Sequence, residues 1–101
     1  MHVILKKAIK EFWDREPAAK VELAAWYKEA KAAAWATPAD VKAKYGNASI
    51  LRAGRVVFNI RGNKYRLIVQ IRFWTEKRDG TIFIRFVGTH AEYDEIDART
   101  I

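Results

Sequence analysis

The chain has 101 residues, of which 50% are apolar and 31% are charged, and it contains no cysteine. This length predicts a single domain over residues 1–101, and the composition excludes a disordered or collagen-like chain. Without cysteine there are no disulfides, thiolate metal sites or thiol nucleophiles, and two histidines are too few for a typical zinc centre. The aliphatic run Val3–Leu5 is too short for a signal peptide or a membrane span. We therefore expect a cytoplasmic protein with no membrane partner, no cofactor and no bound metal.

The positive charge is concentrated in one part of the chain, whose net charge is +7 overall. Residues 1–49 hold nine basic and six acidic residues (+3), residues 50–90 hold nine and two (+7), and residues 91–101 hold one and four (−3). A concentrated basic segment is the electrostatic footprint of a protein that binds a phosphate-rich partner. A solvated basic surface gives the same pattern, so charge alone does not decide between the two.

The first half of the chain is predicted to be helical. Apolar residues recur at helical spacing within Lys6–Arg15. The Ala-, Lys- and Glu-rich stretch Ala18–Trp35 follows Pro17, which suits a first helical turn, so the two segments predict a helical hairpin. A short third helix is predicted within Thr37–Gly46, with the threonine as its N-cap and the glycine as its stop.

The second half is predicted to form strands, because the apolar period changes there from 3.6 to 2. Strands are expected at Val56–Ile60, Tyr65–Trp74 and Ile82–Val87. The turns between them are short, so the three strands should form an antiparallel meander. Met1–Leu5 can add a further strand at the sheet edge.

A capping-box pattern at Thr89–Glu92 predicts a short terminal helix that reaches Ile96. The predicted fold class is therefore α+β. A helical hairpin and a short third helix pack on a small antiparallel sheet, and a short helix follows the last strand.

The long central strand is expected to separate an apolar face from a mixed face. The residues expected to face the helices are Tyr65, Leu67, Val69, Ile71 and Phe73, with Ile82, Ile84 and Phe86 from the next strand. Those expected on the opposite face are Arg66, Ile68, Gln70, Arg72 and Trp74, with Phe83, Arg85 and Val87. A rigid sheet face that is half apolar and half basic suits a ligand or a protein partner.

Arg66, His90 and Tyr93 are the candidate functional residues. In a regular meander the start of the central strand and the end of the third strand lie at the same end of the sheet, so these side chains can converge. An arginine grips a phosphate, a histidine transfers protons and a tyrosine stacks on a base. Such a set suits cleavage of RNA by its own 2′-hydroxyl, because the substrate supplies the nucleophile. The alternative is that none of the three has a catalytic role. His90 is then only a polar residue in a first helical turn, Tyr93 an aromatic residue at the core edge and Arg66 an exposed charge on a strand.

Two segments, Gly62–Val69 and Phe83–Asp94, resemble the HigB branch of the RelE-like toxins. The second segment carries Thr-His-x-Glu-Tyr-Asp directly after a strand and is the more specific of the two. The similarity extends over nearly the whole chain. It implies a RelE-like fold and a type II toxin-antitoxin component. Such a toxin is an mRNA interferase that cleaves mRNA on the ribosome and is neutralised by a helix-turn-helix antitoxin similar to HigA.

The resemblance also implies roles for the three candidate catalytic residues. Arg66 matches the strand arginine that holds the scissile phosphate, His90 matches the histidine after the third strand, and Tyr93 matches the tyrosine of the motif. Val57 and Asn59 stand where RelE itself has two strand lysines. The resemblance therefore leaves the general base unidentified.

Further candidate RNA contacts come from the basic segment: Arg61, Lys64, Arg72, Trp74 and Arg85. Lys64, Arg61 or Arg55 can supply the missing positive charge, and Trp74 can stack on a base or simply pack. Two other functions remain open at this stage. One is a non-catalytic RNA- or ribosome-binding module that uses the same basic sheet face, and the other is a protein-interaction domain that binds an acidic partner.

Overall fold

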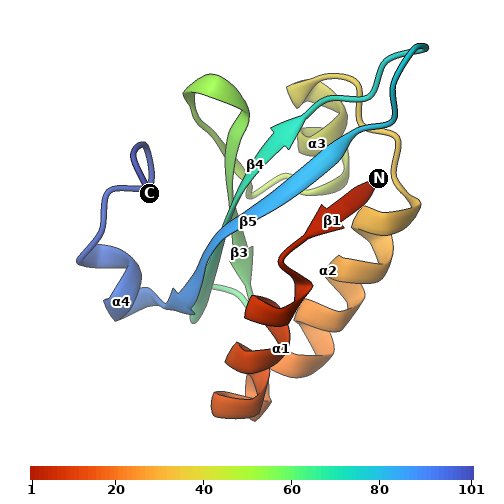
Figure 1. Ribbon diagram of the computed structural model, residues 1–101. Coiled ribbons are helices and arrows are strands. Elements are labelled where there is room, and N and C mark those ends of the chain that lie inside the picture. Colours follow the sequence, from red (N-terminus) through yellow and green to blue (C-terminus); the bar gives the residue numbers. More distant parts are fainter.

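A computed structural model describes all residues, 1–101, and shows a five-stranded sheet with helices packed against one face (Figure 1). The strand order is β1-β5-β4-β3-β2. The strands are β1 (His2–Ile4), β2 (Ser49–Ile50), β3 (Arg55–Ile60), β4 (Tyr65–Arg72) and β5 (Thr81–Thr89). The predicted α+β class is confirmed.

The helices lie close to their predicted positions. They are α1 (Lys6–Arg15), α2 (Lys20–Ala32), α3 (Pro38–Lys44) and α4 (His90–Asp94), with short 3₁₀ turns at Pro17–Ala19 and Arg52–Gly54. The bounds of α1 agree with the prediction. The capping box at the start of α3 is present, and α3 ends two residues before Gly46. None of the helices combines the length and the apolar character needed to cross a membrane.

The prediction for the second helix, Ala18–Trp35, was too long at both ends. Its first turn is a 3₁₀ turn, and Ala33 already has an extended backbone. The amino nitrogen of Met1 donates to the carbonyls of Ala30 and Lys31 at 3.2 and 2.7 Å, and to that of Ala33 at 2.9 Å. The amino group of Met1 thus supplies the hydrogen bonds that carbonyls at the end of a helix lack, so no further helical turn is needed to supply them.

The predicted meander of β3, β4 and β5 is confirmed as an antiparallel unit. The expected edge strand at the start of the chain is also present, and β1 pairs parallel to β5. The short β2 at the other edge, paired with β3, was not predicted. β4 ends at Arg72 rather than Trp74, because the Trp74 N–H leaves the ladder and donates to the Trp35 carbonyl at 2.8 Å.

The helix-facing side of β4 forms the main core. The predicted residues of β4 on this face, and two of the three predicted in β5, join side chains from α1 and α2, and Phe73 packs at the margin. The strand residues of this core cluster that had been predicted are Tyr65, Leu67, Val69, Ile71, Ile82 and Ile84. Apolar alternation therefore identified this face correctly.

A bulge in the middle of β5 reverses the alternation of its side chains. Ile68 pairs with Phe86 and Val69 with Ile84, so Arg85 is an extra residue in β5. One inserted residue moves the following side chains to the other face. Phe86 consequently packs with Ile68 on the far side and Val87 packs against the main core, so the predicted faces of these two residues were wrong.

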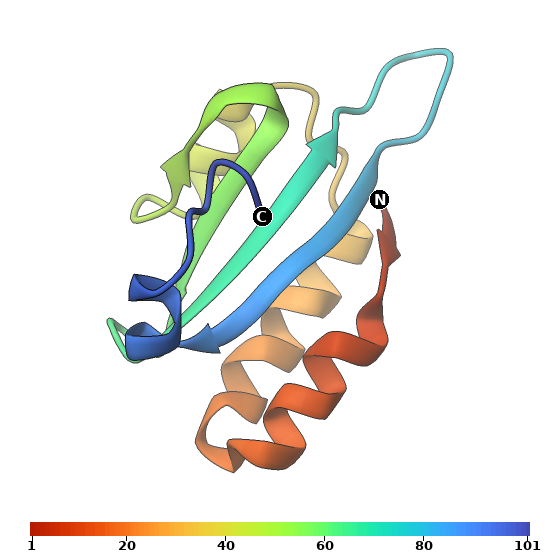
Figure 2. The same ribbon diagram turned by 60° about the vertical axis from the view of Figure 1, so that its left-hand side comes forward.

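A second, smaller core lies on the sheet face away from the hairpin. Val57, Ile68 and Ala98 are buried there, with partly buried apolar residues around them. The chain after α4 crosses this face (Figure 2). The terminal helix was predicted to reach Ile96, but α4 ends at Asp94. Ile96 belongs instead to the segment that covers this face. Part of the face expected to be open is therefore covered.

The main core gives a direct stability prediction. Leu67 is fully buried in β4, and Leu67→Ala should lower the free energy of unfolding by about 2–5 kcal/mol, because it removes apolar contacts and leaves a cavity. Val21 is 83% exposed, so Val21→Ala should change it by no more than about 0.5 kcal/mol. Urea unfolding followed by circular dichroism measures both, and equal effects would contradict this assignment of the core.

Candidate active site

Arg66 places a buried positive charge at the start of β4. It is 8% exposed and is the one charged residue among the buried ones. Its Nη1 donates to the carbonyls of Asn63 and Tyr65 at 3.2 and 3.3 Å. Its Nη2 donates to Asn63 Oδ1 at 2.7 Å and faces His90 Nδ1 at 3.3 Å. The Asn63 and Tyr65 oxygens are neutral acceptors, and no carboxylate forms an ion pair with Arg66.

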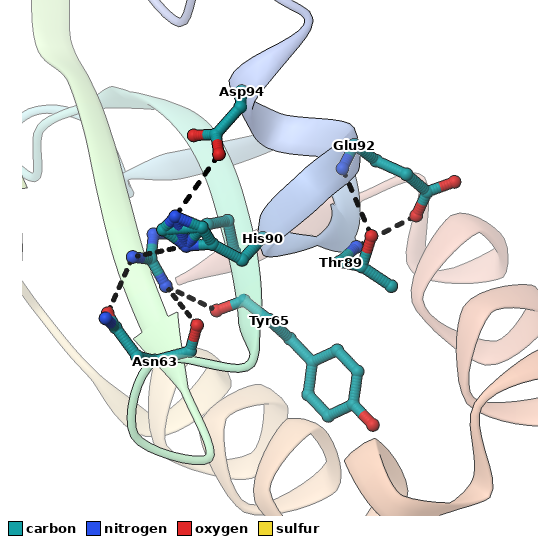
Figure 3. A network of polar contacts seen from close by, with 7 residues as sticks. Asn63, Tyr65, Thr89, His90, Glu92 and Asp94 are labelled. Carbon is teal, nitrogen blue, oxygen red and sulfur yellow. Dashed lines mark hydrogen bonds and ion pairs between the residues drawn. The ribbon is translucent and has the colours of Figure 1, made fainter.

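His90 lies between Arg66 and Asp94 (Figure 3). Its Nδ1 faces the guanidinium, and its Nε2 is 3.4 Å from Asp94 Oδ2. Its backbone N–H donates to the carbonyl of Lys64 at 2.9 Å, which fixes the start of α4 against the β3–β4 turn. Both ring nitrogens therefore have a defined polar neighbour.

Tyr93 completes the group from the same short helix. The Cζ atom of Arg66 lies 5.5 Å from the centre of the Tyr93 ring, within the range of a cation–π contact. The ring also packs at the margin of the second core. The structure thus brings together the three residues that the sequence predicted would converge, one from β4 and two from α4.

The capping box predicted at Thr89 holds α4 in place. The Glu92 N–H donates to Thr89 Oγ1 at 3.1 Å, and the Thr89 N–H donates to Glu92 Oε1 at 2.9 Å. The same Oε1 accepts from Arg15 Nη2 at 3.2 Å, which connects α4 to α1. The hydrogen bond from the Thr89 backbone, followed by that from Arg15, lowers the pKa of Glu92.

Gly88 gives α4 the room to start where it does. It pairs with Arg66 across the sheet. A Cβ at this position would lie 2.5 Å from the Phe86 ring and 3.1 Å from the Glu92 carboxylate. A larger residue would therefore push against the capping box that positions His90.

Two hollows can be compared as places for a substrate. An open depression of about 410 Å³ lies beside Tyr93 and Asp94 and is also lined by Leu51 and Arg99. A cavity of about 300 Å³ between α2 and β3 contains Glu22 and Glu29 among its lining residues. Asp94 and Asp97 line the depression, so each hollow contains two carboxylates and this charge does not favour either one for a phosphodiester. The depression is the one that is lined by Tyr93.

The comparison with known proteins agrees with this geometry. The family model described as HigB_toxin, RelE-like toxic component of a toxin-antitoxin system, matches residues 19–96. This chain belongs to that family. It is 31% identical over 96 residues to the mRNA interferase toxin HigB of Escherichia coli strain K12, and to the mRNA interferases HigB of Escherichia coli O157:H7 and Shigella flexneri. Each alignment covers 93% of this chain and 88% of the relative.

The resemblance stated from the sequence is therefore confirmed. Membership of the HigB family makes this chain the RelE-like toxic component of a toxin-antitoxin system, and an antitoxin is its partner. The matched residues 19–96 contain β4, β5 and α4, so the Arg66 network lies within the part that defines the family.

Two other candidates of this HigB-family chain lie in the β3–β4 turn. The Lys64 side chain is exposed beside the network, and its carbonyl holds the start of α4. Arg61 points elsewhere: its Nη1 donates to the carbonyl of Ala18 at 3.1 Å, and its backbone N–H donates to the Glu22 carboxylate. Arg61 thus connects the turn to the helical layer.

The remaining candidates lie farther along the sheet. The Cζ atoms of Arg72 and Arg85 are 6.0 and 5.8 Å from the centre of the Phe83 ring, and Arg85 Nη2 donates to Gln70 Oε1 at 2.7 Å. At about 3.3 Å per strand residue, Arg72 lies roughly 20 Å along the strand direction from Arg66. Trp74 lies beyond the end of β4 and is 36% exposed. These residues extend the basic surface and do not touch the network.

Asn63 and Asp94 belong to the network but were not predicted. Asn63 stood within a predicted turn, where asparagine is common for conformational reasons alone. Asp94 follows His90 by four residues, a spacing that brings two side chains together on a helix, and this spacing was visible in the sequence.

The lowered pKa of Glu92 gives a pH prediction. The interactions of its carboxylate add stability above about pH 4.3, the ordinary pKa of a glutamate, and this stability is lost as the pH falls through the lower pKa of the folded state. The difference in melting temperature between the wild type and Glu92→Gln should therefore be largest near pH 7 and should shrink towards pH 3.

Thermal unfolding at a series of pH values measures this difference. Glu76→Gln is the matched control, because the exposed Glu76 side chain forms no ion pair and no hydrogen bond. A difference between wild type and Glu92→Gln that stayed constant from pH 7 to pH 3 would show that the Glu92 charge adds nothing to stability.

Proposed function

We propose that this HigB-family protein is an mRNA interferase, an endoribonuclease that cleaves mRNA bound to the ribosome. The observation that carries the proposal is the buried guanidinium of Arg66, which is surrounded by neutral acceptors and keeps its positive charge available for an anion. The relatives at 31% identity, which are called mRNA interferases, support the same activity.

The three side chains divide the work of a transesterification. Arg66 binds the scissile phosphate and stabilises the negative charge that develops on it. His90 transfers a proton, and Tyr93 orients the nucleotide by stacking or hydrogen bonding. The 2′-hydroxyl of the RNA is the nucleophile, so the reaction needs no bound metal and no cofactor. The products are a 2′,3′-cyclic phosphate and a 5′-hydroxyl.

The proposal extends to the surface around the site. Lys64, Arg72 and Arg85 carry positive charge that can contact mRNA or ribosomal RNA, and Arg61 and Trp74 lie at the margins of this surface. The protein acts as one domain in the cytoplasm. Its antitoxin is a small helix-turn-helix protein similar to HigA, and the gene next to this one should encode it.

The assigned roles predict the effect of two substitutions on growth. Arg66→Ala and His90→Ala should each remove the growth arrest that expression of the wild-type chain causes in a bacterial host. Each loses a contribution of roughly 10²–10⁴ in rate. Arg52→Ala removes the same charge as Arg66→Ala from an exposed side chain with no polar contact, so it should stay toxic. Undiminished toxicity of both site variants would refute the roles.

Primer extension on translated mRNA separates a nuclease from a non-catalytic RNA-binding module. The wild type should produce defined cuts only when the message is on ribosomes, and the downstream fragments should start with a 5′-hydroxyl that polynucleotide kinase can label directly. A module that only binds would give RNA affinity that falls with salt and no cut products. Fragments with a 5′-phosphate would indicate hydrolysis by water instead of attack by the 2′-hydroxyl.

A further inference from the structure

We infer that Asp94 is a positioning residue for His90 and that it makes Nδ1 the ring nitrogen that accepts the proton of the 2′-hydroxyl. The inference rests on the proposed nuclease function. It adds a residue to which the sequence analysis assigned no role, and it decides which of the two imidazole nitrogens reacts.

Arg66 and Asp94 both bear on where the proton of the imidazole lies. A guanidinium can only donate hydrogen bonds, so the approach of Arg66 Nη2 to His90 Nδ1 at 3.3 Å favours an Nδ1 that accepts and carries no proton. In the neutral ring the proton is then on Nε2. That nitrogen faces Asp94 Oδ2 at 3.4 Å (Figure 3). The two neighbours of His90 therefore select the same tautomer.

Asp94 has no second task in the structure. Its carboxylate makes no polar contact other than the one with His90, and its side chain is 61% exposed. The two residues lie one helical turn apart on α4, so the helix itself holds the carboxylate beside the ring. Because the imidazole of His90 is the one polar partner of this carboxylate, Asp94 fits a role in orienting the imidazole better than a role in folding.

This tautomer accounts for where each proton goes during the reaction. When a phosphodiester binds Arg66, the Nη2–H that faces Nδ1 turns to a phosphate oxygen, and Nδ1 can receive the 2′-hydroxyl proton. The O2′–H bond breaks, the O2′–P bond forms and the P–O5′ bond breaks. The 5′-oxygen leaves with a proton from solvent. His90 becomes an imidazolium whose Nε2–H still faces the Asp94 carboxylate, which stabilises the new positive charge. Such contacts often shorten in the substrate complex.

The tautomer can be measured without any activity. The chain contains only two histidines, His2 and His90, so two-bond ¹H–¹⁵N spectra resolve both rings, and His2→Gln assigns them. Above pH 7.5 the wild type should show His90 as the Nε2–H form. Asp94→Asn should change the Nδ1 and Nε2 shifts towards a mixture of tautomers, whereas Glu95→Gln should not, because Glu95 makes no side-chain polar contact. An Nδ1–H wild type, or equal spectra for both variants, would overturn the inference.

Single-turnover cleavage of a defined mRNA on purified ribosomes gives the functional test. Asp94→Asn should slow the cleavage step about 10- to 100-fold, less than the 10²–10⁴ that a general base contributes, and leave binding to the mRNA-ribosome complex within about twofold of the wild type. Glu95→Gln should cleave at the wild-type rate. Equal rates for the two variants would refute the role of Asp94 alone. A wild type that binds the complex but does not cut would instead refute the proposed function.

Discussion

The buried guanidinium of Arg66 at the start of β4 is the charge around which the β3–β4 turn and α4 are arranged. Burying a cation is costly unless its N–H groups find acceptors, and here the Asn63 turn, the Tyr65 carbonyl and His90 supply them. These acceptors come from neighbouring segments, so the turn, the strand and α4 are held in one arrangement. Because no acceptor is a carboxylate, the charge is solvated by the protein without being neutralised. A phosphodiester can supply the missing negative charge.

The helix that carries His90 is five residues long and could not be stable alone. Three features compensate for its length: the capping box of Thr89 and Glu92, the ion pair from Arg15, and the backbone hydrogen bond to Lys64. They tie α4 to α1 and to the β3–β4 turn. The second core adds apolar contacts on the other side, where the chain after α4 lies over the sheet. Chemistry on a short helix is thus supported by contacts from both faces of the sheet.

The proposed reaction requires little from the protein, because RNA brings its own nucleophile. What remains is to bind the phosphate, move one proton and hold the nucleotide. These are the tasks that we propose for Arg66, His90 and Tyr93, with Asp94 as the positioning residue that directs the proton to one nitrogen. Arg72, roughly 20 Å along the strand from Arg66, lies too far away to take part in bond breaking, and Arg85 makes its polar contact with Gln70. They fit the longer contacts that a ribosome-bound message would offer.

Local patterns in the sequence determined the helices, the three-strand meander, the cap at Thr89 and the convergence of Arg66 with His90 and Tyr93. Each depends on residues close together in the chain or on the regular geometry of a meander. Tertiary structure alone decided the bulge at Arg85 and the second core. The bulge leaves no mark in the alternation of β5, and the second core joins segments that meet only after folding. Propensity and periodicity describe neighbours in sequence, so they could not specify contacts between separate elements.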